Sequence, residues 1–217
     1  MLKYILFDLD GTLTNPEKGI VNCAKFALEY YGIHEEDNDK LRSFIGPPLH
    51  KSFSQHYGFS TEKAREAIAK YRERFSTIGL FENEPYDGVV DMLKLLKEKG
   101  LKMAIASSKP EVFVKKISDK FGFTPYLDFQ VGCHLDGTLE EKEEVMAKAL
   151  ELLNVQNKEE AIMVGDRKFD VEGSKINAVK CIGIKLGFAT ENELEEAGAD
   201  YVVQDIKELT ELLLNMM

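Results

Sequence analysis

Short runs of apolar residues alternate along the chain with longer stretches in which apolar residues recur every three or four positions. The short runs have the length and content of buried strands, and the longer stretches have the period of amphipathic helices. The runs predicted as strands are residues 4–7, 102–107, 161–166, 180–185 and 200–204. Strands that alternate with helices imply right-handed crossovers within one sheet. The pattern therefore predicts an α/β fold with a mostly parallel sheet.

The predicted helices each have one apolar face. In residues 88–100, Met92 and Leu96 lie on the same face of the helix, and residues 143–154 and 205–217 repeat this spacing. We expect these helices to cover the sheet in an α/β sandwich.

One long segment interrupts the alternation. Residues 16–83 contain no predicted strand, and the spacing of apolar residues such as Ile20 and Tyr71 indicates helices instead. A structureless connection of that length would be unusual within a compact domain. We therefore predict a helical domain at residues 16–83, inserted into an α/β core that comprises residues 1–15 and 84–217.

Composition and charge restrict the possible partners. The chain has 217 residues, of which 44% are hydrophobic and 30% charged, and its formal net charge is −10. The hydrophobic content is sufficient for a substantial core. A net negative charge repels nucleic acids and anionic membranes, so we expect neither as a partner. A small phosphorylated ligand is compatible, because a bound metal and a few cations can reverse the field in one pocket.

Three cysteines, Cys23, Cys133 and Cys181, are widely separated in the sequence. Their spacing indicates neither a disulfide framework nor a metal site, and we expect buried thiols in a reducing compartment. The N-terminal segment carries a charge too early for a signal peptide or a membrane span. We therefore expect a cytoplasmic protein. The sequence sets no oligomeric state, and a monomer or a weak dimer is compatible with it.

Two acidic side chains follow the first predicted strand. In FDLDGTLT, Asp8 and Asp10 are two positions apart, so the alternation of a strand would place both carboxylates on one side. Gly11 lets the chain bend away, and Thr12 supplies a hydroxyl. Carboxylates this close are typical of metal sites, or of pairs in which one acid is ionised and the other protonated. The alternative is a solvated loop at the end of a strand.

Other polar side chains follow other predicted strands. Ser107 and Asp166 each end a strand, Asp170 comes four residues after Asp166, and Lys142 lies near the start of the predicted helix 141–153. In a parallel sheet, the carboxyl ends of all strands open onto one crevice, where ligands bind. We therefore expect Ser107, Lys142 and Asp166 to converge with the two N-terminal aspartates.

This set of motifs resembles the haloacid dehalogenase-like hydrolases, in the branch that contains phosphoglycolate phosphatases and 5′-nucleotidases. The four motifs of that family match in order as DLDGTLT (8–14), Ser107, Lys142 and GDRKFD (165–170). The helical insertion matches the position of the family's C1 cap. The resemblance covers essentially the whole chain and implies a Rossmann-like, doubly wound core with an inserted helical cap.

The sequence LDGTL recurs at residues 135–139, where we expect no active site. His134 takes the place of Asp8 there, so the paired carboxylates are absent. Asp136 and Gly137 are common turn residues, and turn chemistry explains the second copy.

The resemblance implies hydrolysis of a small phosphomonoester, such as phosphoglycolate or a nucleoside 5′-monophosphate. Asp8 would attack phosphorus and form an aspartyl-phosphate. Asp10 would protonate the leaving group and then deprotonate the attacking water. Ser107 and Lys142 would hold the phosphoryl oxygens.

The same resemblance implies Mg²⁺ as the cofactor. Its ligands would be Asp8, the backbone carbonyl of Asp10, and Asp166, and Asp170 would support the metal's waters rather than bind directly.

Further candidates for substrate binding lie in both predicted domains. Thr12 belongs to the first motif, and Ser108 competes with Ser107 for the second. Arg42 and Lys51 flank the cap turn RSFIGPPLHKSF, where the resemblance implies contacts to the leaving group. The alternative is an ordinary Gly-Pro-Pro turn between helices.

Three other functions fit parts of the pattern. A sugar phosphomutase of the β-phosphoglucomutase type shares the core motifs. A non-catalytic module that binds phosphate or Mg²⁺ could share the fold, although no motif residue is missing. A receiver domain phosphorylated at Asp8 would have neither the large insertion nor the acid at Asp10.

Overall fold

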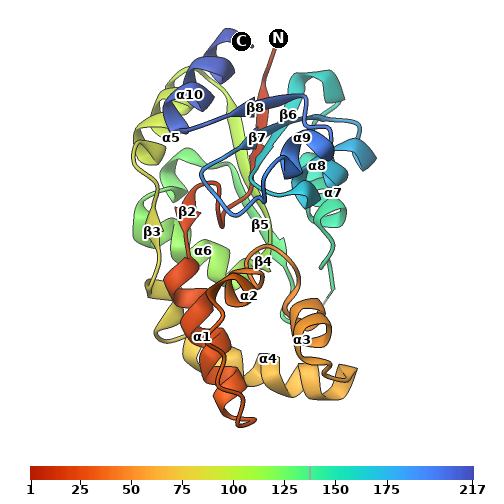
Figure 1. Ribbon diagram of the computed structural model, residues 1–217. Coiled ribbons are helices and arrows are strands. Elements are labelled where there is room, and N and C mark those ends of the chain that lie inside the picture. The colour runs from red at the N-terminus through yellow and green to blue at the C-terminus, as the bar shows by residue number, and fades with distance from the viewer. Residues whose placement is uncertain (137) are drawn as a thin grey trace. The chain divides into compact units, whose positions relative to one another are not determined.

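In the computed structural model, the chain forms two compact units (Figure 1). Unit 1 comprises Met1–Thr14 and Pro85–Met217, and unit 2 comprises Asn15–Glu84. The structure describes residues 1–136 and 138–217, so Gly137 of the second LDGTL copy lies outside the described residues.

Unit 1 is built on a six-stranded parallel sheet with the order β5-β4-β1-β6-β7-β8. Its strands are β1 (Tyr4–Phe7), β4 (Lys102–Pro110), β5 (Phe129–Cys133), β6 (Ala161–Gly165), β7 (Lys180–Ile184) and β8 (Tyr201–Val203). The chain extends the sheet on one side of β1 and then on the other, which is the doubly wound arrangement. The predicted fold class is therefore confirmed. Strand β1 is a central strand, so its carboxyl end lies near the middle of the edge at which all the parallel strands end.

Helices cover both faces of this sheet. They are α5 (Val89–Glu98), α6 (Glu111–Phe121), α7 (Lys142–Leu152), α8 (Lys168–Ile176), α9 (Glu193–Glu196) and α10 (Ile206–Asn215), with the 3₁₀ turns η2 (Thr124–Tyr126) and η3 (Lys158–Glu160). Helices α7 to α9 lie on one side of the sheet, and α5, α6 and α10 lie on the other (Figure 1). Among the described residues, no helix is long and apolar enough to span a membrane.

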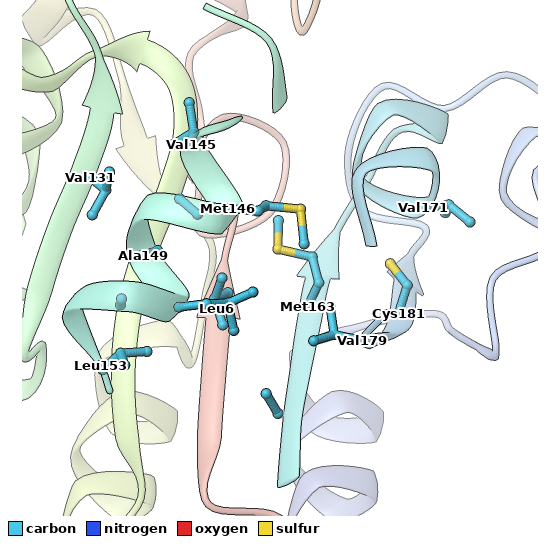
Figure 2. Packing of buried hydrophobic residues seen from close by; sticks show 14 of the residues in the cluster. Leu6, Val131, Val145, Met146, Ala149, Leu153, Met163, Val171, Val179 and Cys181 are labelled. Carbon is cyan, nitrogen blue, oxygen red and sulfur yellow. The ribbon is translucent and has the colours of Figure 1, made fainter. Parts of the chain in front are cut away.

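One core cluster fixes α7 and α8 on the sheet. Leu6 of β1 and Met163 of β6 both belong to it, and they are register partners in the neighbouring strands. Figure 2 shows Met146 of α7 beside Met163. Burial of such side chains contributes about 1.5–3 kcal/mol each. This packing positions the first residue of α7, Lys142, at the carboxyl end of the sheet.

Strand β5 was not predicted, and β4 is longer than predicted. β4 continues past Ser107 to Pro110, with a register shift between these two residues. Gly132 of β5 allows the close approach, because a Cβ atom there would collide with the backbone of Lys109 and Glu111. Ser107 therefore lies inside a strand rather than at its end.

Unit 2 is helical. It contains α1 (Glu17–Glu29), α2 (Asn38–Arg42), α3 (Leu49–Tyr57), α4 (Thr61–Phe75) and the 3₁₀ turn η1 (Gly79–Phe81). Helices α1 and α4 pack on each other. The ring of Phe53 contacts those of Phe44 and Phe59, with centroids 5.0 and 5.8 Å away, which gives the unit an aromatic core of its own.

Local signals explain the helix ends in unit 2. Ser60 accepts a hydrogen bond from Lys63 N and caps α4. Pro48 immediately precedes α3, where its fixed φ angle suits the start of a helix. The predicted cap turn is consequently shorter than expected, because its last five residues, 49–53, already belong to α3. Strands β2 (Thr14–Asn15) and β3 (Glu84–Pro85) pair where the chain passes between the units.

Two leucines of α7 test the importance of this core. Leu150 is 1% exposed and belongs to the core cluster, whereas Leu152 is 39% exposed. Leu150→Ala should lower the free energy of unfolding by about 2–5 kcal/mol, because it leaves a cavity. Leu152→Ala should cost less than about 1 kcal/mol. Urea denaturation followed by circular dichroism measures both, and equal losses would contradict the assigned role of the cluster.

Candidate active site

The first motif forms a tight turn at the carboxyl end of β1. Asp8 N donates to Val164 O over 2.9 Å, which holds Asp8 beside β6. The carbonyl of Leu9 then accepts hydrogen bonds from Leu13 N at 2.9 Å and Thr14 N at 3.0 Å. Gly11 adopts a φ of 87°, a conformation that favours glycine. This turn therefore places Asp10 in the site. The prediction that strand alternation would place Asp8 and Asp10 on one side does not apply, because β1 ends at Phe7.

Lys142 is the central cation of the site. Its Nζ lies 2.8 Å from Asp8 Oδ1 and 2.7 Å from Asp170 Oδ1, and it donates to Ala106 O over 2.7 Å. The side chain is 6% exposed. Burial alone would lower the pKa of Lys142, but the carboxylates of Asp170 and Asp8 outweigh burial and raise it. Lys142 therefore remains protonated, and its three contacts hold the ammonium group in place.

The fourth motif supplies two buried carboxylates. Asp166 directly follows β6 and is fully buried; its Oδ2 accepts from Phe188 N at 2.7 Å and its Oδ1 from Thr12 Oγ1 at 3.5 Å. Burial raises the pKa of Asp166 well above its ordinary value. Asp170 accepts from Arg167 N at 3.0 Å at the start of α8. Burial raises the pKa of Asp170 too, although Lys142 opposes the shift.

These carboxylates suit a divalent cation. Asp8, Asp166 and Asp170 can each present one oxygen within 4.8 Å of the others. Apart from Lys142, Oδ1 of Asp8 and Oδ1 of Asp170 have no hydrogen-bond partner among the described residues. Hard divalent ions prefer oxygen ligands, and a cation would offset the repulsion among the three acids.

The site of unit 1 therefore brings together most of the predicted motif residues. Asp8, Lys142 and Asp170 are in direct contact, and Thr12 contacts Asp166. Ser107 is buried and follows Ala106, whose carbonyl binds Lys142.

Comparison with known proteins decides the family. The model of the haloacid dehalogenase-like hydrolases matches residues 5–184. The chain belongs to this family. The haloacid dehalogenase-like hydrolase described here is 42% identical to a 5′-nucleotidase of Pseudomonas aeruginosa over 96% of this chain and 94% of that protein. The resemblance inferred from the four motifs is confirmed.

Two further relatives are informative. The hydrolase is 32% identical to tyrosine-protein kinase PtkA of Mycobacterium tuberculosis, over 96% of this chain and 72% of that protein. The crystal structure of a predicted phosphatase from Clostridium acetobutylicum has 43% identity and a TM-score of 0.95, with 99% of both chains covered.

Lys109 belongs to the site but was missed from the sequence. This buried lysine forms an ion pair with Asp10, and its N donates to Ser107 Oγ over 3.4 Å. Burial raises the pKa of Asp10, and Lys109 opposes this shift. The one available signal was a lysine just before Pro110, at the end of an apolar strand. Lys109 lies two residues after Ser107 in the part of β4 that extends beyond the predicted strand, and both residues are buried.

The other predicted substrate residues are placed differently. Ser108 is half-buried in β4 of unit 1. Arg42 and Lys51 lie in unit 2, where Arg42 Nε pairs with Glu17 Oε1 at 2.6 Å. The roles of Ser108, Arg42 and Lys51 in substrate binding stay predictions.

In the second LDGTL copy, the described residues Leu135, Asp136 and Thr138 are exposed. Asp136 is exposed and accepts a hydrogen bond from Thr138 N at 2.9 Å. His134 Nδ1 lies 2.7 Å from Thr138 Oγ1. These contacts are local to the turn.

Replacing Lys142 with methionine should destabilise the protein in EDTA. Asp8 and Asp170 would remain buried without the cation that they share, and the loss of one partner of a buried ion pair costs about 3–5 kcal/mol. Lys148→Met is the control, because Lys148 pairs with Glu151 at the surface of the same helix. Its cost should be below about 1 kcal/mol. Urea denaturation compares the variants, and equal stability would rule out the central role of Lys142.

Proposed function

We propose that this protein is a Mg²⁺-dependent phosphatase that hydrolyses a small phosphorylated metabolite through an aspartyl-phosphate on Asp8. One observation carries the proposal: the buried carboxylate of Asp8 contacts Lys142 and lies within a cluster of acids that suits a metal ion. A second acid, Asp10, follows two residues later and pairs with a different lysine, Lys109.

In the first step, Asp8 is the nucleophile. Lys142 orients its carboxylate from one side, and the hydrogen bond from Asp8 N to Val164 O fixes its backbone. Attack on phosphorus forms the aspartyl-phosphate and breaks the bond to the leaving oxygen. Lys142 and Ser107 then balance and hold the charge on the phosphoryl oxygens.

Asp10 is the proton donor and acceptor. It protonates the leaving oxygen in the first step and takes a proton from water in the second. In that second step the water oxygen attacks phosphorus and the bond to Asp8 breaks, which releases phosphate and restores the Asp8 carboxylate. Burial raises the pKa of Asp10 while Lys109 lowers it, and these opposed effects suit a group that must both give and take a proton.

The metal ligands would be Asp8, the backbone carbonyl of Asp10, and Asp166. When bound, Mg²⁺ supplies positive charge beside the phosphoryl oxygens. Asp170 has one oxygen on Lys142 and the other on Arg167 N, which supports a role for Asp170 in orienting the site rather than as a direct ligand.

The relatives support a substrate class. The similarity to a 5′-nucleotidase favours a nucleoside 5′-monophosphate, and phosphoglycolate fits the same chemistry. Thr12, Ser108, Arg42 and Lys51 are the residues that we assign to substrate binding. We place the protein in the cytoplasm, where such metabolites are found.

A second candidate function is transfer of the phosphoryl group to an acceptor other than water. The name of the Mycobacterium tuberculosis relative describes such transfer for that protein. A sugar phosphomutase would use the same nucleophile.

A panel of phosphorylated metabolites tests the proposal. With Mg²⁺, we expect release of phosphate from nucleoside 5′-monophosphates or phosphoglycolate, and from p-nitrophenyl phosphate. EDTA should abolish release and added Mg²⁺ restore it, because the clustered carboxylates otherwise repel each other and the substrate. No release from any compound would refute the phosphatase assignment. Isomerisation of a sugar phosphate without release would favour the mutase.

Asp10→Asn tests the acid–base assignment. Turnover of alkyl phosphates should fall about 10²–10⁴-fold, because asparagine can neither give nor take the proton. With p-nitrophenyl phosphate, the first step needs little protonation, so the aspartyl-phosphate should accumulate. Mass spectrometry of the intact protein after an acid quench detects this species.

The second LDGTL copy supplies the control for this variant. Asp136→Asn makes the same change in the same local sequence, at an exposed turn, and should leave turnover unchanged. If Asp10→Asn slows alkyl and aryl substrates equally and no phosphoenzyme forms, Asp10 is not the acid–base group.

A further inference from the structure

The loop between β7 and α9 packs against Asp166. Phe188 N in this loop donates to Asp166 Oδ2 over 2.7 Å. Gly187 lies so close that a Cβ atom there would collide with the Asp166 carboxylate and the carbonyl of Gly11. Tyr86 Oη donates to Leu186 O over 3.1 Å and holds the start of the loop. The loop therefore covers one side of the Asp166 carboxylate and donates a hydrogen bond to it.

Glu193 holds the C-terminal end of this loop through hydrogen bonds. It is the first residue of α9, and its side chain is 8% exposed. Oε1 accepts from Arg167 Nε at 2.8 Å and Lys168 N at 2.9 Å. Oε2 accepts from Thr190 N and Thr190 Oγ1, both at 3.1 Å. Both oxygens of one carboxylate are thus used, each by two donors.

These donors come from the two segments on either side of Asp166. Arg167 and Lys168 directly follow Asp166 in the chain, whereas Thr190 comes two residues after Phe188. Glu193 therefore joins the segment that carries the Asp166 carboxylate to the segment that donates a hydrogen bond to it. Helix α8 begins at Lys168 and α9 begins at Glu193, and the two helices are in contact (Figure 1).

We propose that Glu193 is a positioning residue that holds the Asp166 carboxylate in the orientation required to bind the divalent cation. The inference rests on the proposed function, in which Asp166 is a metal ligand. The carboxylate of Glu193 does not touch the site and acts through Arg167, Lys168 and the Phe188 N–H. Hydrogen bonds behind a metal ligand fix its orientation, and their loss weakens metal binding about 10–100-fold.

The test measures metal affinity apart from activity. Mn²⁺ binding to the whole protein is titrated by electron paramagnetic resonance, for the wild type, Glu193→Ala and Glu193→Gln. Glu193→Ala should bind Mn²⁺ about 10–100-fold more weakly. Glu193→Gln should be intermediate, because glutamine keeps one acceptor oxygen for the pair of donors on one side. At saturating Mg²⁺, turnover of p-nitrophenyl phosphate by both variants should recover.

A matched control lies on the same short helix. Glu195 pairs with Lys185 at the surface, 42% exposed, and Glu195→Ala should keep the wild-type Mn²⁺ affinity. Thr190→Val removes only the hydroxyl donor and gives a milder variant should Glu193→Ala fail to fold. It should still weaken Mn²⁺ binding measurably.

The outcomes separate the two proposals. If the folded Glu193 and Thr190 variants bind Mn²⁺ as tightly as the wild type, even with a lower melting temperature, Glu193 is only a structural link and the inference is wrong. If the wild type itself binds no Mn²⁺, the proposed metal site fails, and the inference fails with it.

Discussion

The ion pairs of Lys142 are the interaction on which the arrangement of unit 1 depends. One buried ammonium group joins the end of β1 through Asp8, β4 through the carbonyl of Ala106, and α8 through Asp170, while its own backbone begins α7. A buried charge is tolerated only when it is paired and fully hydrogen-bonded. The hydrophobic cluster between α7 and the sheet brings the lysine to this point, and the carboxylates retain it there. One residue thus contributes both to the packing of α7 and to the charge balance of the site.

The sequence predicted most of unit 1 because buried parallel strands appear as continuous apolar runs. Strand β5 was not predicted because it is short and contains Gly132, and glycine weakens the sequence pattern of a strand. The structure nevertheless requires glycine there, because the backbone of Lys109 and Glu111 packs closely against it. The motif aspartates and Lys142 could be predicted because the ends of parallel strands converge. Lys109 was not predicted, because the strand was expected to end at residue 107, whereas β4 continues to Pro110 and buries Lys109 two residues after Ser107. The contacts of Glu193 likewise join distant segments that no local pattern connects.

The acids of the site differ in how they are held. Asp8 and Asp170 share a lysine, Asp10 has a second lysine, and Asp166 has neutral donors from Thr12 and Phe188. Neutral donors orient the Asp166 carboxylate without neutralising it. Burial raises the pKa of Asp166 well above its ordinary value, so a bound divalent cation would favour the ionised form. Side chains of one type thus lie in different surroundings, which fits the separate roles that we propose for Asp8, Asp10 and Asp166.

The pairing of β2 with β3 has an evolutionary consequence. The chain leaves unit 1 at Thr14 and returns at Pro85, through two strands that are hydrogen-bonded to each other. Since the two ends of the insertion are adjacent, a longer or shorter insertion adds little entropy of loop closure. The aspartates, lysines and threonine of the motifs all lie outside it. Insertions and deletions between these strands can therefore accumulate in a lineage while the scaffold for the chemistry is inherited intact.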